Sequence, residues 1–106
     1  MRKIEEAMCA AVKERKNWEL SNTRVQVCKD KTSVRVSVYL FDNRIYEHVS
    51  DTSTGYSMKT FTLAGWDTIT TRNRLRALGV GVHRLNKKPH YNGKAIDKEK
   101  WYEVKK

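Results

Sequence analysis

Residues 33–40 read SVRVSVYL and hold the cleanest alternation of apolar and polar side chains in the sequence. Val34, Val36, Val38 and Leu40 fall on one side of an extended chain, because successive side chains of a strand point to opposite faces. This alternation is typical of an antiparallel strand with one buried face. We therefore expect the strand to lie inside an antiparallel sheet.

Further strand patterns flank this one on both sides. Upstream, apolar and polar residues alternate over 23–28, and Asp30-Lys31 is suited to a turn. Downstream, Asp42-Asn43 predicts a tight hairpin turn, since both residues tolerate positive φ. The chain then returns as a strand over 44–49. A polar loop is expected over 50–55 and another strand over 56–63.

Two helices are also predicted. The first covers residues 2–17, where apolar residues recur at helical spacing: Ile4, Ala7, Met8, Ala11 and Val12. The second, near 67–78, can be capped by Asp67 or Thr68 and closed by Gly79. After it we expect a strand over 80–85, a hairpin turn at Asn92-Gly93 and a short last strand over 101–104.

The order of these elements sets the fold class. Strands that follow one another with short turns favour an antiparallel sheet, and helices at its ends favour packing on one face. At 106 residues the chain fits one domain, 1–106. We predict an α+β fold with four to six short antiparallel strands, packed by the N-terminal helix and the second helix near 67–78.

The charge is strongly positive and unevenly distributed. The net charge is +10. Residues 1–64 carry 11 positive and 8 negative side chains, whereas residues 65–106 carry 11 and 4. An excess of this size attracts polyanions such as nucleic acid or an acidic protein surface. The alternative is a lysine-rich surface that only keeps the protein in solution.

The second helix carries the candidate site. Arg72 and Arg76 are four residues apart and share one flank, while Arg74 emerges on the other. Hydroxyl groups at the helix start add to the free N–H groups that favour an anion there. The candidate phosphate-binding residues are Thr70, Thr71, Arg72, Arg74, Arg76, Arg84, Lys87 and Lys88. The alternative is an ordinary capped, solvated helix.

Aromatic residues in the same half have two interpretations. They could offer stacking surfaces to unpaired bases, or they could belong to the core of a small domain. The residues concerned are Trp66, Tyr91, Trp101 and Tyr102.

The run LAGWDTITTRNRLRAL over residues 63–78 resembles an AGWxTxTTxxRLxAL signature of small bacteriophage proteins. The resemblance extends over about residues 34–85, including the turn and strand at Asp42-Asn43-Arg44-Ile45. It implies a phage origin and a similar fold, and it carries over no catalytic residue. Residues 70–89 also look like the recognition helix of transposase-type helix-turn-helix domains. The preceding segment departs from that pattern, because it alternates like a strand.

Motifs for catalysis and metal binding are missing from the sequence. His48, His83, His90, Cys9 and Cys28 lack the close spacing of a zinc site, although His83 and His90 could approach across adjacent strands. No phosphate-binding glycine loop, GxSxG or HExxH motif occurs. We expect no enzyme activity, no metal and no cofactor. The two cysteines are expected as free thiols in a reduced compartment, with a disulfide between them as the alternative.

The sequence therefore predicts a basic phage protein that binds nucleic acid through the phosphate backbone, DNA ahead of RNA. The alternative is a host-takeover or anti-defence protein that inhibits an acidic host protein. No signal peptide or membrane span is expected, so the predicted location is cytoplasmic, in the host cell if the chain is phage-encoded.

Overall fold

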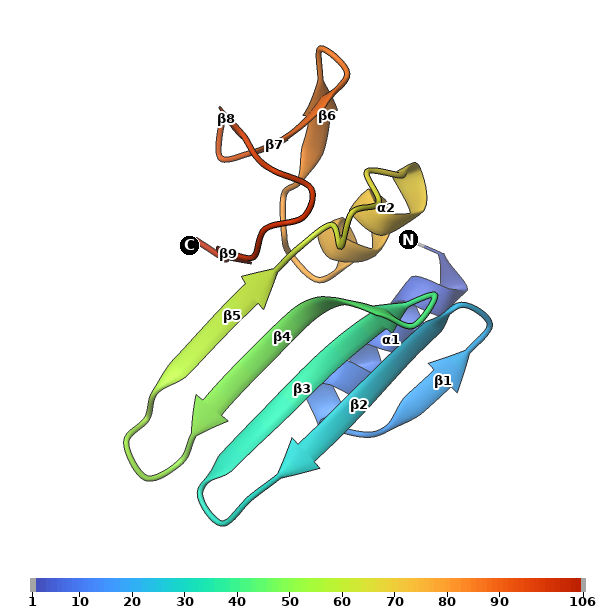
Figure 1. Ribbon diagram of the computed structural model, residues 1–106. Helices are drawn as coiled ribbons and strands as arrows, with labels where there is room; N and C mark the ends of the chain where they lie inside the picture. The colour runs from blue at the N-terminus through green and yellow to red at the C-terminus, as the bar shows by residue number, and fades with distance from the viewer. Residues whose placement is uncertain (1, 106) are drawn as a thin grey trace.

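The computed structural model describes residues 2–105, and this range holds two helices and two antiparallel sheets (Figure 1). The large sheet has the strand order β1-β2-β3-β4-β5-β9, and the small sheet has the order β6-β7-β8. The helices are α1 (Lys3–Glu14) and α2 (Ile69–Ala77). The strands are β1 (Trp18–Leu20), β2 (Thr23–Lys29), β3 (Ser33–Leu40), β4 (Asn43–Asp51), β5 (Ser57–Phe61), β6 (His83–Leu85), β7 (Lys88–Tyr91), β8 (Lys94–Ala95) and β9 (Tyr102–Glu103). The predicted α+β fold class is confirmed.

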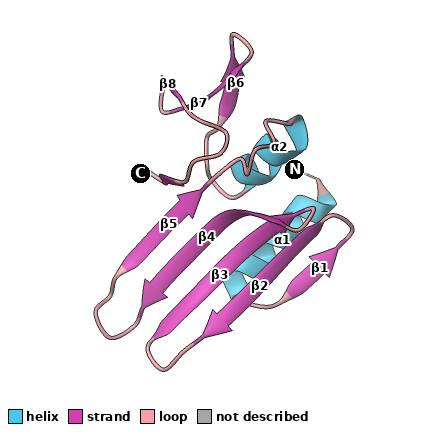
Figure 2. Ribbon diagram, viewed as in Figure 1, coloured by secondary structure: helices cyan, strands magenta, loops and turns pink. Residues whose placement is uncertain are grey.

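The core lies between α1 and one face of the large sheet. Figures 1 and 2 show α1 behind the long strands, while the other sheet face carries no helix of the described chain. The four alternating apolar residues of β3 are all buried, in one cluster with Met8 and Ala11 of α1. Phe61 and Leu63, at the end of β5 and just beyond it, extend the same cluster. The alternation in residues 33–40 thus predicted the buried face correctly.

Two hairpin turns were predicted from residue type, and one of them is displaced. The expected turn at Asn92-Gly93 is confirmed, since both residues have positive φ (52° and 78°) between paired Tyr91 and Lys94. The turn expected at Asp42-Asn43 is made instead by Phe41 and Asp42, with φ of 50° and 64°. Asn43 is already paired with Leu40. Its Nδ2 donates a hydrogen bond to the Phe41 carbonyl at 3.2 Å, which favours the shifted turn.

Helix α2 begins and ends close to where its capping residues predict. Thr68 is the N-cap, and its Oγ1 accepts a hydrogen bond from the Thr71 N–H at 3.2 Å. Gly79, with φ of 89°, turns the chain away just after the helix. The strand expected over 80–85 forms only at 83–85, while Val80 and Val82 are buried in the core. Neither helix in residues 2–105 is long and apolar enough to cross a bilayer.

The buried Tyr46 gives the fold a predicted sensitivity to alkaline pH. Burial, and after it the neighbouring Cys9 thiol, raises the pKa of Tyr46 to about 12. An unfolded tyrosine titrates near pH ~10. The neutral hydroxyl of Tyr46 therefore stabilises the fold fully below pH ~10, and this stabilisation is lost as the pH rises through the folded pKa of Tyr46.

We expect wild-type stability to fall by about 1.4 kcal/mol per pH unit more than that of Tyr46→Phe between pH ~10 and ~12. Urea unfolding at a series of pH values measures this difference. Tyr56→Phe is the control, because Tyr56 is exposed. Parallel pH profiles for the wild type and Tyr46→Phe would show that the Tyr46 hydroxyl does not contribute.

Candidate nucleic-acid interface

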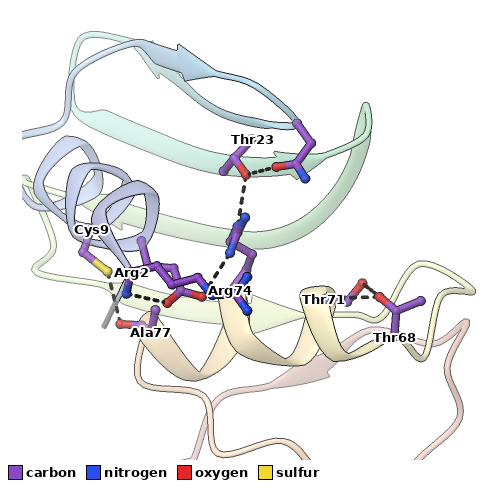
Figure 3. Close-up of polar contacts among 9 residues, drawn as sticks. Arg2, Cys9, Thr23, Thr68, Thr71, Arg74 and Ala77 are labelled. Atoms are coloured by element: carbon purple, nitrogen blue, oxygen red, sulfur yellow. Dashed lines mark hydrogen bonds and ion pairs between the residues drawn. The ribbon is translucent and has the colours of Figure 1, made fainter.

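Arg74 is buried, so its predicted place on an exposed flank of the second helix is wrong. Only 3% of the residue is exposed. Its Nη1 lies 3.0 Å from Oε2 of Glu5, and its Nε donates to Oγ1 of Thr23 at 3.1 Å (Figure 3). These contacts join α2 to α1 and to the start of β2. Arg74 therefore connects three elements of the fold, and its charge is already neutralised.

Arg72 is also buried, at 6% exposure, and does not share an exposed flank with Arg76. It forms an ion pair with Asp67, which precedes the helix. Arg76 is exposed and makes no ion pair within residues 2–105. The predicted three-arginine surface is thus reduced to a single free guanidinium. Spacing along a helix gives the direction in which each side chain points. It does not show which faces of the helix are buried against other elements.

Of the two predicted threonines at the helix start, Thr71 is held within the protein and Thr70 is not. Thr71 is 1% exposed, and its hydroxyl lies 2.9 Å from that of Thr68, as Figure 3 shows. Thr70 is half-buried. The Thr71 N–H and the hydroxyl groups of Thr68 and Thr71 thereby bond within the protein and are not free to bind an anion.

The remaining predicted residues gather on the small sheet. Arg84 lies on β6, Lys87 in the turn and Lys88 at the start of β7, and all three are exposed. Lys94 on β8, outside the predicted set, adds a fourth exposed cation. We call Arg84, Lys87, Lys88 and Lys94 the hairpin cations. None of them makes an ion pair in the described chain. The sequence holds no Asp or Glu from residue 68 to residue 96, a signal that could have identified this sheet.

The small sheet projects from the body but has a firm base. In Figure 1 it stands beyond the Phe61 end of β5, away from the long strands. At its base, the Tyr91 ring packs edge-on against Phe61 with centroids 4.8 Å apart. The Tyr91 hydroxyl also bonds the backbone of Lys105. These contacts attach the base of the small sheet to Phe61 and to the backbone at Lys105.

His83 and His90, which the sequence allowed to approach each other across adjacent strands, do so on this sheet. The residues are paired across β6 and β7, and their rings stack with centroids 5.7 Å apart. Among residues 2–105 no group of three or more His, Cys, Asp or Glu side chains could hold a metal ion. Cys9 and Cys28 are free, and the Cys9 Sγ donates to the Ala77 carbonyl at 3.1 Å (Figure 3).

The aromatic residues divide between core and surface. Tyr91 and Tyr102 pack on Phe61 and belong to the core. Trp66 and Trp101 are 59% and 42% exposed. Trp101 lies under the Arg44 guanidinium, 5.1 Å from ring centroid to Cζ.

The arginines on the uncovered sheet face are engaged by neighbours. Arg35 and Arg44 both pair with Glu47, at 3.6 and 3.0 Å. Arg24 pairs with Asp42 at 3.4 Å and stacks on Tyr39. This face therefore carries far less free charge than the small sheet.

The resemblance to a helix-turn-helix domain is not supported by the structure. A strand, β5, directly precedes α2, and the other helix of the described chain, α1, lies far from α2 in the sequence, with five strands between them. No first helix stands before α2 to cross a nucleic-acid backbone.

Comparisons with known proteins identify one family. The family model described as Kyanoviridae Gp96 protein matches residues 1–103. No curated protein and no solved structure matches the chain.

The buried ion pair yields a prediction about stability. Arg74→Ala leaves Glu5 as a buried charge without its partner, so we expect a loss of about 3–5 kcal/mol in the free energy of unfolding. Arg76 lies two residues further along the same helix but is exposed, so Arg76→Ala should cost less than about 0.5 kcal/mol of the free energy of unfolding. Urea denaturation followed by circular dichroism compares the two variants. Equal losses would mean that the Arg74 ion pair contributes nothing beyond an exposed arginine.

Proposed function

The chain belongs to the Kyanoviridae Gp96 protein family, and we propose that this bacteriophage protein binds the phosphate backbone of nucleic acid through its small sheet. The hairpin cations, Arg84, Lys87, Lys88 and Lys94, make the main contact. Duplex DNA is the first expected partner and RNA the second.

One observation supports this proposal above the others: the hairpin cations are four exposed charges on one small sheet, and none of them makes an ion pair in the described chain. They lie on three adjacent short strands and their turn. By contrast, Arg72 and Arg74 are neutralised by Asp67 and Glu5. Unneutralised cations gain most from a polyanion, because their binding releases the counterions condensed on it.

The turn between β6 and β7 suits a backbone contact. Asn86 and Lys87 both have positive φ, 53° and 64°, as in a tight two-residue hairpin turn. The turn places Lys87 at the tip of the projecting sheet, where a nucleic-acid backbone can reach it. Contacts of this kind fix position on a polymer and carry little sequence information.

Binding through these cations is expected to weaken as the salt concentration rises. We expect Lys87→Ala/Lys88→Ala to bind duplex DNA more weakly and to reduce the slope of log K against log salt by about 2, at about 0.9 per phosphate contact. Fluorescence anisotropy with duplex and single-stranded DNA and RNA at several salt concentrations measures the slope. The matched control is Lys98→Ala/Lys100→Ala, two exposed lysines beside Asp97 and Glu99. Absence of binding to all four polymers at low salt, or an unchanged slope in the hairpin variant, refutes the proposal.

A second candidate function, binding of an acidic host protein, is favoured by an apolar pocket at the other end of α2. The pocket has a volume of about 460 Å³ and is lined by Leu40, Phe41, Asn43, Ile45, Leu63, Trp66, Thr68 and Thr71. Phe41 and Trp66 at its edge are 66% and 59% exposed, and Ile69 beside it is 64% exposed. Exposed aromatic residues around a pocket are typical of the centre of a protein interface.

The net charge of a protein partner decides whether it is attracted to this pocket. A second copy of the chain also carries +10 and is repelled, whereas an acidic partner is attracted. The carboxylates nearest the pocket, Asp42 and Asp67, are paired with Arg24 and Arg72 and offer little repulsion. An apolar cavity of about 150 Å³ holds one benzene ring, so this pocket has room for two neighbouring apolar side chains.

If this second function is correct, a nuclease-treated host lysate yields a stoichiometric acidic partner with wild-type protein. Phe41→Ala/Trp66→Ala should weaken its affinity about 30-fold or more, as loss of a central anchor does. Tyr56→Ala, which removes an exposed aromatic residue outside the pocket, should leave the affinity unchanged. A partner retained at full affinity by the Phe41/Trp66 variant, or lost with Lys87→Ala/Lys88→Ala alone, contradicts a role for the pocket.

A further inference from the structure

We propose that a second pocket, between α1 and the β4–β5 strand pair, binds a small ligand that carries a phosphate group and an apolar part. The pocket has a volume of about 330 Å³. Its polar lining is formed by Lys13, Arg15, His48 and Lys59, and its apolar lining includes Val12, Tyr46 and Leu78. This site lies on different elements from the hairpin cations and does not depend on their function.

Strand register brings the polar groups onto one face of the sheet. His48 of β4 is paired directly with Lys59 of β5, and Ser50 is paired with Ser57. Both pairs lie on the same side as the Tyr46–Phe61 pair, because alternate residues of a strand share a face. The inward face of the sheet thus changes from apolar to polar along β4.

The end of α1 leaves this polar part of the face open. The helix ends at Glu14, and Arg15 takes a left-handed conformation with φ of 57° that turns the chain away. The Arg15 Nη2 lies 3.5 Å from the Ser50 Oγ, and the His48 Nε2 lies 2.7 Å from the Ser57 Oγ. Guanidinium, ammonium and imidazole groups therefore line one pocket, and all three can donate hydrogen bonds to phosphate oxygens.

The pocket holds positive charge that the described chain does not neutralise. No Asp or Glu lines it. Lys13, Arg15 and Lys59 make no ion pair within residues 2–105. Burial, followed by Lys59 and Arg15, lowers the pKa of His48, as expected where positive charges have no counterion. A bound phosphate would supply that counterion.

The apolar lining defines the rest of the ligand. Val12 comes from α1, Leu78 directly follows α2, and Tyr46 comes from β4 of the sheet. A free inorganic anion would leave these side chains uncovered, whereas a ring attached to the phosphate would cover them. The class of ligand that fits is an organic phosphate with a ring, such as a nucleoside monophosphate.

The test uses the full-length protein with adenosine monophosphate and with inorganic phosphate as probes. We expect the His48 ring resonances to shift on titration with both, the pKa of His48 to rise, and the nucleotide to bind more tightly. Arg15→Ala and Lys59→Ala should each weaken nucleotide binding about ten-fold, the loss expected for one charge-assisted hydrogen bond. Lys16→Ala is the matched control, because Lys16 pairs with Glu14 and does not line the pocket.

Thermal unfolding of each variant checks that its fold is retained. Lys59→Arg should restore part of the binding that Lys59→Ala loses. Three results would overturn the proposal: no His48 shift with millimolar nucleotide, equal affinity of the Lys16 and Lys59 variants, or a shift only with a 5′-phosphorylated oligonucleotide. The last result would assign the pocket to nucleic acid. Lys87→Ala/Lys88→Ala should bind the nucleotide normally, which separates failure of this site from failure of the small sheet.

Discussion

The buried ion pair between Arg74 and Glu5 is the contact on which the arrangement of the other elements depends. It joins residues 69 positions apart, and the hydrogen bond to Thr23 extends it to the large sheet. Two charges withdrawn from water are tolerated only while they satisfy each other, so α2 has one favourable position against α1. That position fixes both segments that flank α2. The preceding segment carries Trp66 to the edge of the apolar pocket, and the following one buries Val80 and Val82 before the small sheet begins.

Periodicity in the sequence predicted the large sheet well, since the valines at positions 34, 36 and 38 show their buried face directly. Capping chemistry placed α2 within two residues of its observed bounds. The roles of its arginines were not predictable in the same way. A helical wheel assigns Arg72 and Arg74 to flanks and does not show their partners. Glu5 and Thr23 lie 69 and 51 positions from Arg74, where no local pattern connects them, whereas Asp67 lies five positions from Arg72 but outside the helix. The displaced turn at Phe41 has a similar cause: an Asn43 side-chain bond, rather than turn propensity alone, decides which two residues take positive φ.

Charge in this protein has two separate uses. One set of arginines pairs with carboxylates inside the protein: Arg72 and Arg74 of α2, and Arg35 and Arg44 on the uncovered sheet face. Two groups of cations make no ion pair in the described chain, one on the small sheet and one in the pocket beside His48. On the small sheet the lack of ion pairs follows from the sequence, because no acidic residue occurs between Asp67 and Asp97. A polymer backbone suits the exposed small sheet, and a compact ligand suits the pocket. The absence of acidic residues from positions 68–96 is visible in the sequence. The pairing of His48 with Lys59 follows only from the strand register of the structure.

The central claim is that the small sheet, and not helix α2, meets nucleic acid. Backbone amide shifts of isotopically labelled protein, recorded by NMR during titration with duplex DNA at low salt, test it most directly. We expect the largest shifts over residues 83–95 and small ones over residues 69–77, where the arginines at 72 and 74 are buried. Shifts centred on α2 with the small sheet unaffected would contradict it.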